Sequence, residues 1–116
     1  MHPQDKKYFN FARQKNENTM EQLIQNIIEW AKAKGINKKE NSLAQMAKVT
    51  EEVGELASAL IKKNNETLID SIGDVIVTVV ILAEQNGLNV KDCLEVAYNE
   101  IKDRKGSTID GTFIKE

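Results

Sequence analysis

Five acidic residues in two short segments are the part of the sequence best suited to chemistry. They are Glu51, Glu52 and Glu55 in TEEVGEL (50–56), and Asp70 and Asp74 in LIDSIGDVIV (68–77). Residues three or four apart on a helix lie about one turn apart on the same face. Glu52 and Glu55 therefore form one pair, and Asp70 and Asp74 form another. Two carboxylate pairs on two helices predict a site for a hard divalent cation such as Mg²⁺, which prefers oxygen ligands.

The remaining sequence offers few ligands for a softer metal. His2 is the single histidine and Cys93 the single cysteine, whereas zinc and di-iron sites usually draw on several such side chains. The alternative for the glutamates is a solvated helix face with lysine partners. The alternative for Asp70 is a favourable interaction with the dipole at a helix start.

Helical spacing also predicts which glutamates face inward. Apolar residues at i, i+4, i+7 and i+11 form a stripe that we expect to be buried; they are Val49, Val53, Leu56 and Leu60. Glu52 borders this stripe and Glu51 points away from it. Glu52 and Glu55 are thus the better inward candidates, and Glu51 comes second.

Gly54 and Gly73 each lie between the acids of one pair. A glycine inside a helix costs about 1 kcal/mol relative to alanine. A close approach of the two helices at the acidic site would explain both residues, and the alternative is that they are incidental.

Capping residues and glycines divide most of the chain into four predicted helices. Their expected ranges are 20–34, 43–63, 66–86 and 90–105. The expected N-terminal signals are the capping boxes Thr19/Gln22 and Ser42/Gln45 and the N-caps Asn65 and Asn89; the expected stops are Gly35, Gly87 and Gly106. Residues 1–18 are predicted to be an N-terminal arm, residues 19–116 a helical domain, and Asp110-Gly111 a weak hairpin signal. Four helices with short loops predict an all-α bundle.

The segment 66–86 is strongly apolar. VIVTVVIL has strand propensity, but the block is too long for one strand, so a helix is predicted. Ile69, Ile72, Ile76, Val79 and Ala83 trace one helical face. Beyond Asp74 the helix is apolar nearly all round, which implies burial on several sides. One small bundle covers such a helix poorly, so a homodimer or homotetramer is expected.

Composition excludes several broad classes of function. The chain has 116 residues, a net charge of −2 and a pI near 5.5, so it lacks the basic footprint of a nucleic-acid-binding protein. Its longest apolar run is about half a membrane span, and its N-terminus lacks the apolar region of a signal peptide. We therefore expect one cytoplasmic domain that binds neither nucleic acid nor membrane.

The acidic segments, taken in order, resemble a known family. E-E-V-G-E (51–55) followed by Gly73-Asp74 is similar to the pattern of the MazG-like nucleoside triphosphate pyrophosphohydrolases, which is E-E-x-x-E, a spacer and then E-x-x-D. IIEWAKAKGI (27–36) and YNEIKDRKG (98–106) extend the resemblance over about 20–114. The resemblance implies an all-α NTP pyrophosphatase bundle. It also implies Mg²⁺, with Mn²⁺ as an alternative, held by Glu52, Glu55 and Asp74, with Glu51 part of the motif.

The sequence departs from this family pattern at one position. Ser71 stands where the family has the first glutamate of its second motif, and a hydroxyl is a poor substitute for a carboxylate. Asp70 shares the face of Asp74 and is the candidate to supply the missing oxygen.

By the same resemblance, the expected activity is hydrolysis between the α- and β-phosphates, giving a nucleoside monophosphate and pyrophosphate, in housecleaning of the nucleotide pool. A carboxylate that is not fully engaged by metal can accept the proton of the attacking water. Glu51 and Glu55 are both candidates for this base. The alternative to an enzyme is a non-catalytic helical interaction module or nucleotide-binding module.

A second group of residues could bind the substrate; its members are Lys48, Trp30, Asn99, Lys102 and Arg104. Lys48 is expected either to reach a phosphate or to pair with Glu51 or Glu52. The basic residues Lys102, Arg104 and Lys105 either complement the dipole at a helix end or clamp a triphosphate. Asn99 is a sugar or phosphate ligand by resemblance alone. Trp30 is expected in the core, with stacking on a base as the alternative.

Overall fold

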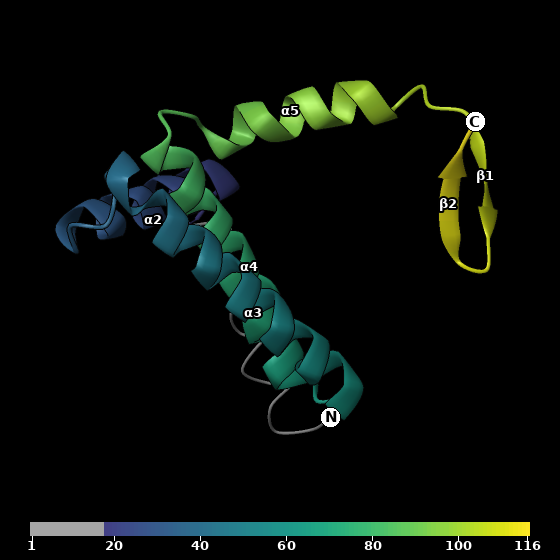
Figure 1. The fold of residues 1–116 in the computed structure, drawn as a ribbon, viewed down its shortest axis with the longest axis horizontal. Helices are drawn as coiled ribbons and strands as arrows, with labels where there is room; N and C mark the ends of the chain where they lie inside the picture. The colour runs from purple at the N-terminus through teal and green to yellow at the C-terminus, as the bar shows by residue number, and fades with distance from the viewer. Residues whose placement is uncertain (1–17) are drawn as a thin grey trace.

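The computed structural model describes residues 18–116, so the predicted arm lies almost wholly outside the described residues. Four α-helices, a short 3₁₀ turn and a two-stranded hairpin follow one another along the chain (Figure 1). They are α2 (Met20–Ala33), the 3₁₀ turn (Lys39–Asn41), α3 (Ser42–Lys62), α4 (Asn65–Gln85), α5 (Val90–Ile101), β1 (Gly106–Ile109) and β2 (Thr112–Lys115). The predicted all-α class with four helices is confirmed.

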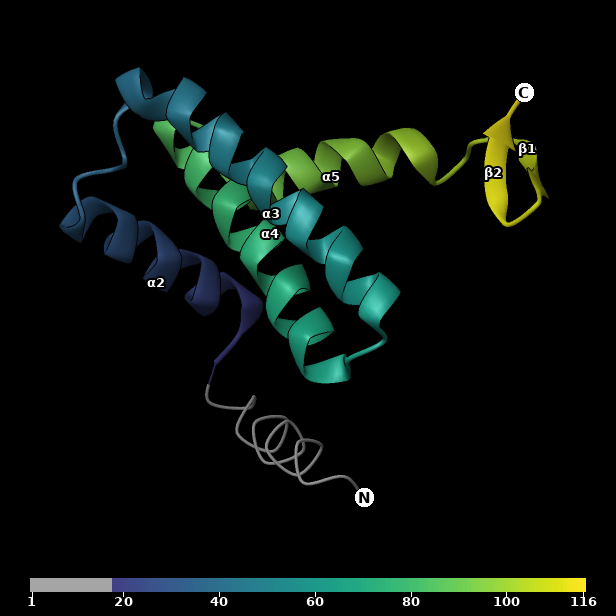
Figure 2. The same cartoon turned by 60° about the horizontal axis from the view of Figure 1, so that its bottom comes forward.

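Helices α3 and α4 form an antiparallel pair that is the centre of the fold (Figures 1 and 2). Only two residues join them, and Lys63 takes a left-handed conformation with φ of 57° at the end of α3. The side chain of Asn64 accepts a hydrogen bond from the Thr67 amide, so Asn64 is the N-cap and the prediction of Asn65 was wrong by one residue. Because the connection is so short, it determines which residues of α3 lie opposite which residues of α4.

The beginnings of α2 and α3 differ in their chemistry. Thr19 Oγ1 accepts a hydrogen bond from the Gln22 amide at 3.1 Å, which confirms the predicted cap of α2. The Ser42/Gln45 capping box was wrong, because Asn41 is the N-cap of α3 and makes no side-chain cap bond. The preceding 3₁₀ turn leads directly into α3. Gln45 is therefore free to donate across to the Thr78 carbonyl on α4, at 3.0 Å.

The face of α3 that packs on α4 is narrower and more polar than predicted. Its buried members follow a spacing of three and four residues; they are Gln45, Val49, Glu52 and Ala59. Val53 and Leu60 of the predicted stripe are 48% and 63% exposed, so the inward face is rotated toward Glu52. On α4 the buried residues facing the other helices include Ser71, Thr78 and Ile81.

Helix α2 packs against α4 and shields part of it from solvent. Ile28 and Ala31 of α2 are buried, as are Val80 and Ile81 of α4. The Gln85 amide donates to the Ile36 carbonyl at 2.6 Å and ties the end of α4 to the loop after α2. This contact closes the core at one end of the molecule.

Helix α5 and the hairpin extend away from the other helices (Figures 1 and 2). The helix ends at Ile101, not at 105 as predicted, and Gly106 begins β1 instead of stopping a helix. The weak hairpin signal is confirmed: Asp110 and Gly111 have φ of 50° and 80°, the positive values that a tight hairpin turn of the I′ type requires. Residues 91–116 are all exposed.

The predicted burial of α4 on several sides is not found among residues 18–116 of one chain. Ile69, Ile72, Ile76 and Val79 are 37% to 50% exposed and share one face of the helix. None of the helices formed by residues 18–116 combines the length and the apolar character needed to cross a lipid bilayer.

Candidate metal and phosphate site

Glu52 is the carboxylate that the fold buries most deeply. Its side chain projects from α3 toward α4, and the residue is only 7% exposed. Oε1 lies 3.4 Å from Lys48 Nζ, whereas Oε2 is buried without a hydrogen-bond partner among the described residues. A buried carboxylate oxygen without a partner is costly. The inward prediction for Glu52 is therefore confirmed, and its free oxygen needs an electropositive group.

Ser71 lies on α4 at about the level of Glu52. Gln45 of α3 bonds to the Thr78 carbonyl of α4, and the two helices are antiparallel. Seven residues after Gln45 is Glu52, and seven residues before Thr78 is Ser71, so Glu52 and Ser71 lie at about the same level. Both residues are buried in the interface. The position where the family pattern has a glutamate thus faces the most buried acid of the first motif.

The other two glutamates of the first motif are exposed. This confirms the outward prediction for Glu51 and shows that the inward prediction for Glu55 was wrong. The carboxyl of Glu55 nevertheless lies next to Glu52: a hydrogen bond to Glu52, together with the charge of Glu52, raises the pKa of Glu55. The two glutamates form one acidic pair at the edge of the interface.

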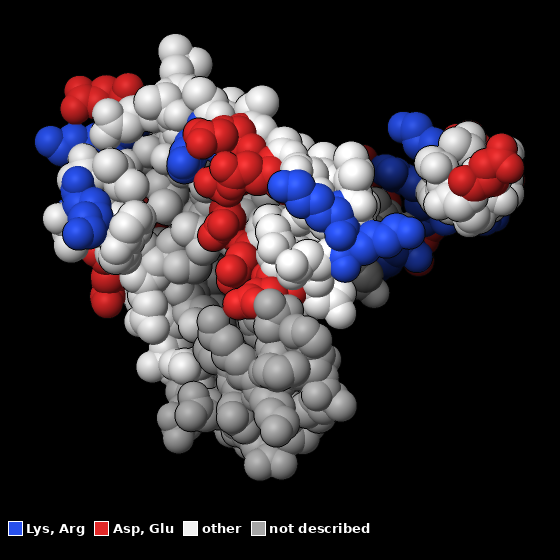
Figure 3. Space-filling model, turned by 90° about the horizontal axis from the view of Figure 1, so that it is seen from below, with Lys and Arg blue, Asp and Glu red and all other residues white. Residues whose placement is uncertain are grey.

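Asp74 faces the same pair from α4. Asp74 is exposed, but desolvation of its carboxyl by neighbouring atoms, followed by the negative charges of Glu52 and Asp70, raises its pKa above the ordinary value. Asp70 is exposed one turn earlier on α4. Acidic side chains gather in a band on the face seen from below, with basic side chains on both sides of it (Figure 3).

Lys48 sits beside these acids and partly compensates their charge. Its ammonium group lies 3.5 Å from Glu51 and 3.4 Å from Glu52. The charge and hydrogen bond of Glu51, and then the bond to Glu52, raise the pKa of Lys48. The pairing alternative for Lys48 is therefore the one found in the free chain.

The two glycines do not mark a close approach of helices. A Cβ atom built at Gly54 or Gly73 would meet no atom within 4 Å. Both positions face open space, so the predicted close approach was wrong and nothing in the structure explains these glycines.

The donor chemistry of the acidic cluster fits a divalent cation, although the cluster is not a ready-made cage. Among residues 18–116, no three acidic, histidine or cysteine side chains are close enough together to hold a metal ion. The unpartnered Oε2 of Glu52, with Glu55 beside it and Asp74 opposite, is nonetheless an oxygen-only donor set of the kind that Mg²⁺ uses. The carboxylates would have to move closer together to complete such a site.

The predicted substrate-binding residues are not assembled with these acids, apart from Lys48. Trp30 is 52% exposed on α2, so the expectation that it lies in the core was wrong. Asn99 lies on the exposed α5, Lys102 follows its last residue, and Arg104 lies beyond the helix and pairs with Glu100 at 3.0 Å. These groups extend with α5 away from the α3–α4 pair (Figure 1).

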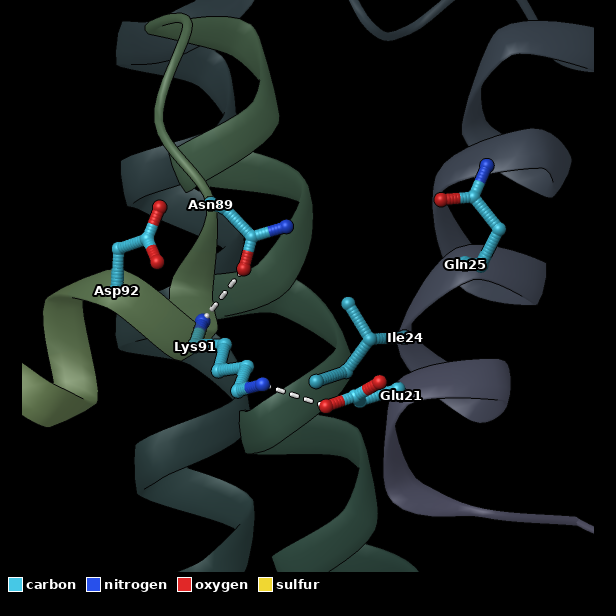
Figure 4. A pocket seen from close by; sticks show the side chains of 6 residues that line it. All are labelled: Glu21, Ile24, Gln25, Asn89, Lys91 and Asp92. Carbon is cyan, nitrogen blue, oxygen red and sulfur yellow. Dashed lines mark hydrogen bonds and ion pairs between the residues drawn. The ribbon is translucent and has the colours of Figure 1, made fainter.

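An open pocket of about 310 Å³ lies elsewhere, between the beginnings of α2 and α5 (Figure 4). Its lining residues are Glu21, Ile24, Gln25, Asn89, Lys91 and Asp92. Lys91 bridges its two sides through an ion pair with Glu21 at 2.5 Å, and the bond and charge of Lys91 lower the pKa of Glu21. None of the predicted site residues lines this pocket. No local sequence pattern points to this pocket, because its two halves are about 70 residues apart.

Comparison with known proteins identifies the segment that carries the acids. The family model described as the MazG nucleotide pyrophosphohydrolase domain matches residues 39–108. An 18.2 kDa protein from the rep–hol intergenic region of Haemophilus phage HP1 is 40% identical over 70 residues. The aligned segment covers 60% of this chain but only 43% of the phage protein, so the chain spans less than half of that relative. No solved structure matches the chain.

Proposed function

Because the chain belongs to the family of MazG nucleotide pyrophosphohydrolase domains, we propose that it hydrolyses nucleoside triphosphates to nucleoside monophosphates and pyrophosphate. The observation that carries the proposal is the free Oε2 of Glu52, buried between α3 and α4 within the matched segment. A fold that needed only a surface charge at this position would not bury it. Removal of surplus or non-standard nucleotides from the cellular pool is the proposed use of this reaction.

The acidic cluster would hold one or more Mg²⁺ ions, or Mn²⁺ in their place. Glu52, Glu55 and Asp74 are the proposed ligands, and Asp70 is the candidate for a further oxygen. A bound ion supplies charge neutralisation for the phosphate oxygens and orients the attacking water. The acids themselves supply negative charge that the ion must offset, which is consistent with the raised pKa values of Glu55 and Asp74.

Glu55 has the more suitable surroundings of the two candidate bases. Glu51 is held in an ion pair with Lys48, at 3.5 Å. Glu55 is exposed and its pKa is raised mainly by Glu52, which makes its carboxylate the better proton acceptor. We therefore assign the proton of the attacking water to Glu55, and a structural or orienting role to Glu51.

The substrate-binding set remains part of the proposal. Lys48 is placed to exchange a glutamate partner for a phosphate oxygen when Mg²⁺ neutralises the acids. Trp30, Asn99, Lys102 and Arg104 are exposed and available to a nucleotide or to another chain. The exposed apolar face of α4 supports a homodimer or homotetramer as the working form.

Product analysis tests the function directly. With millimolar Mg²⁺ and a panel of nucleoside triphosphates, we expect pyrophosphate and monophosphate to appear in equal amounts, with no diphosphate. Mg²⁺ or Mn²⁺ should also raise the Tm by about 5 °C or more, because an ion bound only to the folded chain stabilises it. KCl at matched ionic strength is the control.

Other outcomes of this test identify the alternatives. A metal-dependent rise in Tm without product would indicate a nucleotide-binding module that lost catalysis through Ser71. No rise in Tm and no product would indicate a helical interaction module and contradict the proposed function.

The variant Asp70→Asn tests the proposed replacement for the missing glutamate. If Asp70 supplies a ligand oxygen, the Mg²⁺ concentration needed for half-maximal activity should rise about 10- to 100-fold. Glu66→Gln, on the first turn of the same helix, is the matched control and should leave the metal titration unchanged. An unchanged titration in Asp70→Asn would remove Asp70 from the ligand set.

A further inference from the structure

Lys48 is the one basic residue, among residues 18–116, that pairs with the acidic cluster of α3 and α4. The members of this cluster are Glu51, Glu52, Glu55, Asp70 and Asp74. The ammonium group of Lys48 lies 3.4 Å from Glu52 Oε1 and 3.5 Å from Glu51 Oε2. Five carboxylates beside one ammonium group leave the cluster with a net negative charge.

The lysine compensates only half of the buried carboxylate. It lies close to Oε1 of Glu52, whereas Oε2 is buried without a hydrogen-bond partner among the described residues. The side chain of Lys48 is 50% exposed and that of Glu52 only 9%. Lys48 therefore pairs with this carboxylate from the solvent side, and its ammonium group can leave without opening the core.

A divalent cation bound at Glu52 and the ammonium group of Lys48 exclude each other. Both are attracted by the same carboxylate, and two positive charges a few ångströms apart repel each other. An ion pair that is open to solvent contributes little free energy, because water solvates both groups well. The pairing of Lys48 with Glu52 is therefore the weaker of the two interactions and is readily given up.

A released Lys48 would have a new partner in the proposed reaction. A polyphosphate that joins a metal ion in the cluster brings further negative oxygens to the same place, and lysine binds phosphate as a compact point charge. Lys48 is four residues before Glu52, so about one helical turn separates their positions on α3. Its long side chain can thus reach phosphate oxygens held beside Glu52.

We propose that Lys48 holds Glu52 in the metal-free chain and passes to the polyphosphate once that carboxylate is engaged by a divalent ion. This inference rests on the proposed function, because it needs both a metal ion and a polyphosphate at the cluster. In the metal-free chain the charge of Lys48 lowers the affinity for the ion. After the ion has bound, the same charge raises the affinity for phosphate, so binding is ordered with the metal first.

Calorimetric titration of Lys48→Met tests both halves of this exchange. Methionine keeps an unbranched side chain and removes the charge. Mg²⁺ alone should bind about 10-fold more tightly than to the wild type, because no ammonium group competes for Glu52. Imidodiphosphate, a non-hydrolysable polyphosphate added at saturating Mg²⁺, should bind about 10-fold more weakly, because a charged contact is lost. Binding of Mg²⁺ to imidodiphosphate in solution is the same for both chains and cancels in the comparison.

Lys62→Met is the matched control, because Lys62 is an exposed lysine of the same helix, about 21 Å further along it. Salt screens a charge at this distance, so both affinities should stay within about twofold of the wild type. Lys48→Arg keeps the positive charge and should retain both affinities within about threefold. Circular dichroism in chelator checks the fold, and Lys48→Gln carries the same two expectations if the methionine variant does not fold.

The two affinities must shift in opposite directions. An unchanged Mg²⁺ affinity would show that Lys48 does not compete with the metal, and an unchanged imidodiphosphate affinity would show that it only pairs with glutamates; either result overturns the exchange. A wild-type chain that binds no Mg²⁺ would overturn the exchange together with the proposed function. Pyrophosphate release is measured separately, so opposite shifts in a chain without hydrolytic activity would support the exchange and contradict the proposed function alone.

Discussion

Replacing Glu52 by glutamine is expected to lower the rate of pyrophosphate release by roughly 1,000-fold at saturating Mg²⁺. Glutamine has the same shape but removes the negative charge that a divalent ion needs at the centre of the cluster. Glu52 carries the largest effect because it is the only member of the first motif that the fold buries, and its Oε2 has no hydrogen-bond partner among the described residues. Steady-state assays with a sensitive pyrophosphate detector measure the loss.

The same substitution should stabilise the metal-free chain. The side chain of Glu52 is buried beside two acids, and its charge raises the pKa of both Glu55 and Asp74. A carboxyl whose pKa is raised by folding binds protons more tightly in the folded chain, so its ionised form near neutral pH opposes folding. Removing the charge of Glu52 relieves that cost, and Lys48 keeps Glu51 as its partner. We expect a rise of about 4 °C or more in Tm in the presence of a chelator.

Glu40→Gln, an exposed substitution before α3, is the matched control and should change neither the Tm nor the activity. A variant at position 52 that loses activity but becomes less stable would indicate that the glutamate is a structural partner of Lys48. A variant that keeps near wild-type activity would remove Glu52 from the ligand set. An increase in stability with loss of activity is typical of a site in which function is maintained at the expense of stability.

Local signals in the sequence were sufficient for the elements but not for how they pack. Thr19 and Asn89 cap helices where the pattern placed them, and Asp110-Gly111 forms the turn that its two positive φ values allow. Capping and turn chemistry act over a few residues, so they can be predicted from neighbours alone. The direction of the Gln45 side chain could not be predicted in this way, because its partner, the Thr78 carbonyl, is 33 residues away.

The orientation of α3 shows why the site was only partly predictable. The apolar stripe through Val53 and Leu60 was expected to be buried, yet the helix turns Gln45, Glu52 and Ala59 toward α4. The most apolar face of a helix is buried only if another element covers it, and α5 and the hairpin extend away from the helix pair (Figure 2). Glu52 borders both the predicted apolar stripe and the face that is actually buried, so its burial could be predicted. Glu55 was predicted to face inward but is exposed.

Introducing a glutamate at position 71 is expected to make the stability of the fold depend on Mg²⁺. Ser71 is 6% exposed and lies at about the level of Glu52, so Ser71→Glu would place a second carboxylate in the same buried interface. An uncompensated buried charge costs about 3 kcal/mol or more. Without metal, the Tm should therefore fall by about 12 °C or more. Thermal melts in chelator and in millimolar Mg²⁺ measure the difference.

The family pattern has a glutamate where this chain has Ser71, so a divalent ion should accept the new carboxylate as a ligand. With Mg²⁺ present, we expect most of the lost stability to return and the hydrolytic activity to be retained. Ser58→Glu, at an exposed position of α3, is the matched control and should respond to Mg²⁺ as the wild type does. If Ser71→Glu folds with Mg²⁺ but is inactive, or if Mg²⁺ gives it no stability beyond the wild-type response, the ion does not sit between Glu52 and position 71. The ligands would then have to be sought among the exposed acids at the edge of the helix pair.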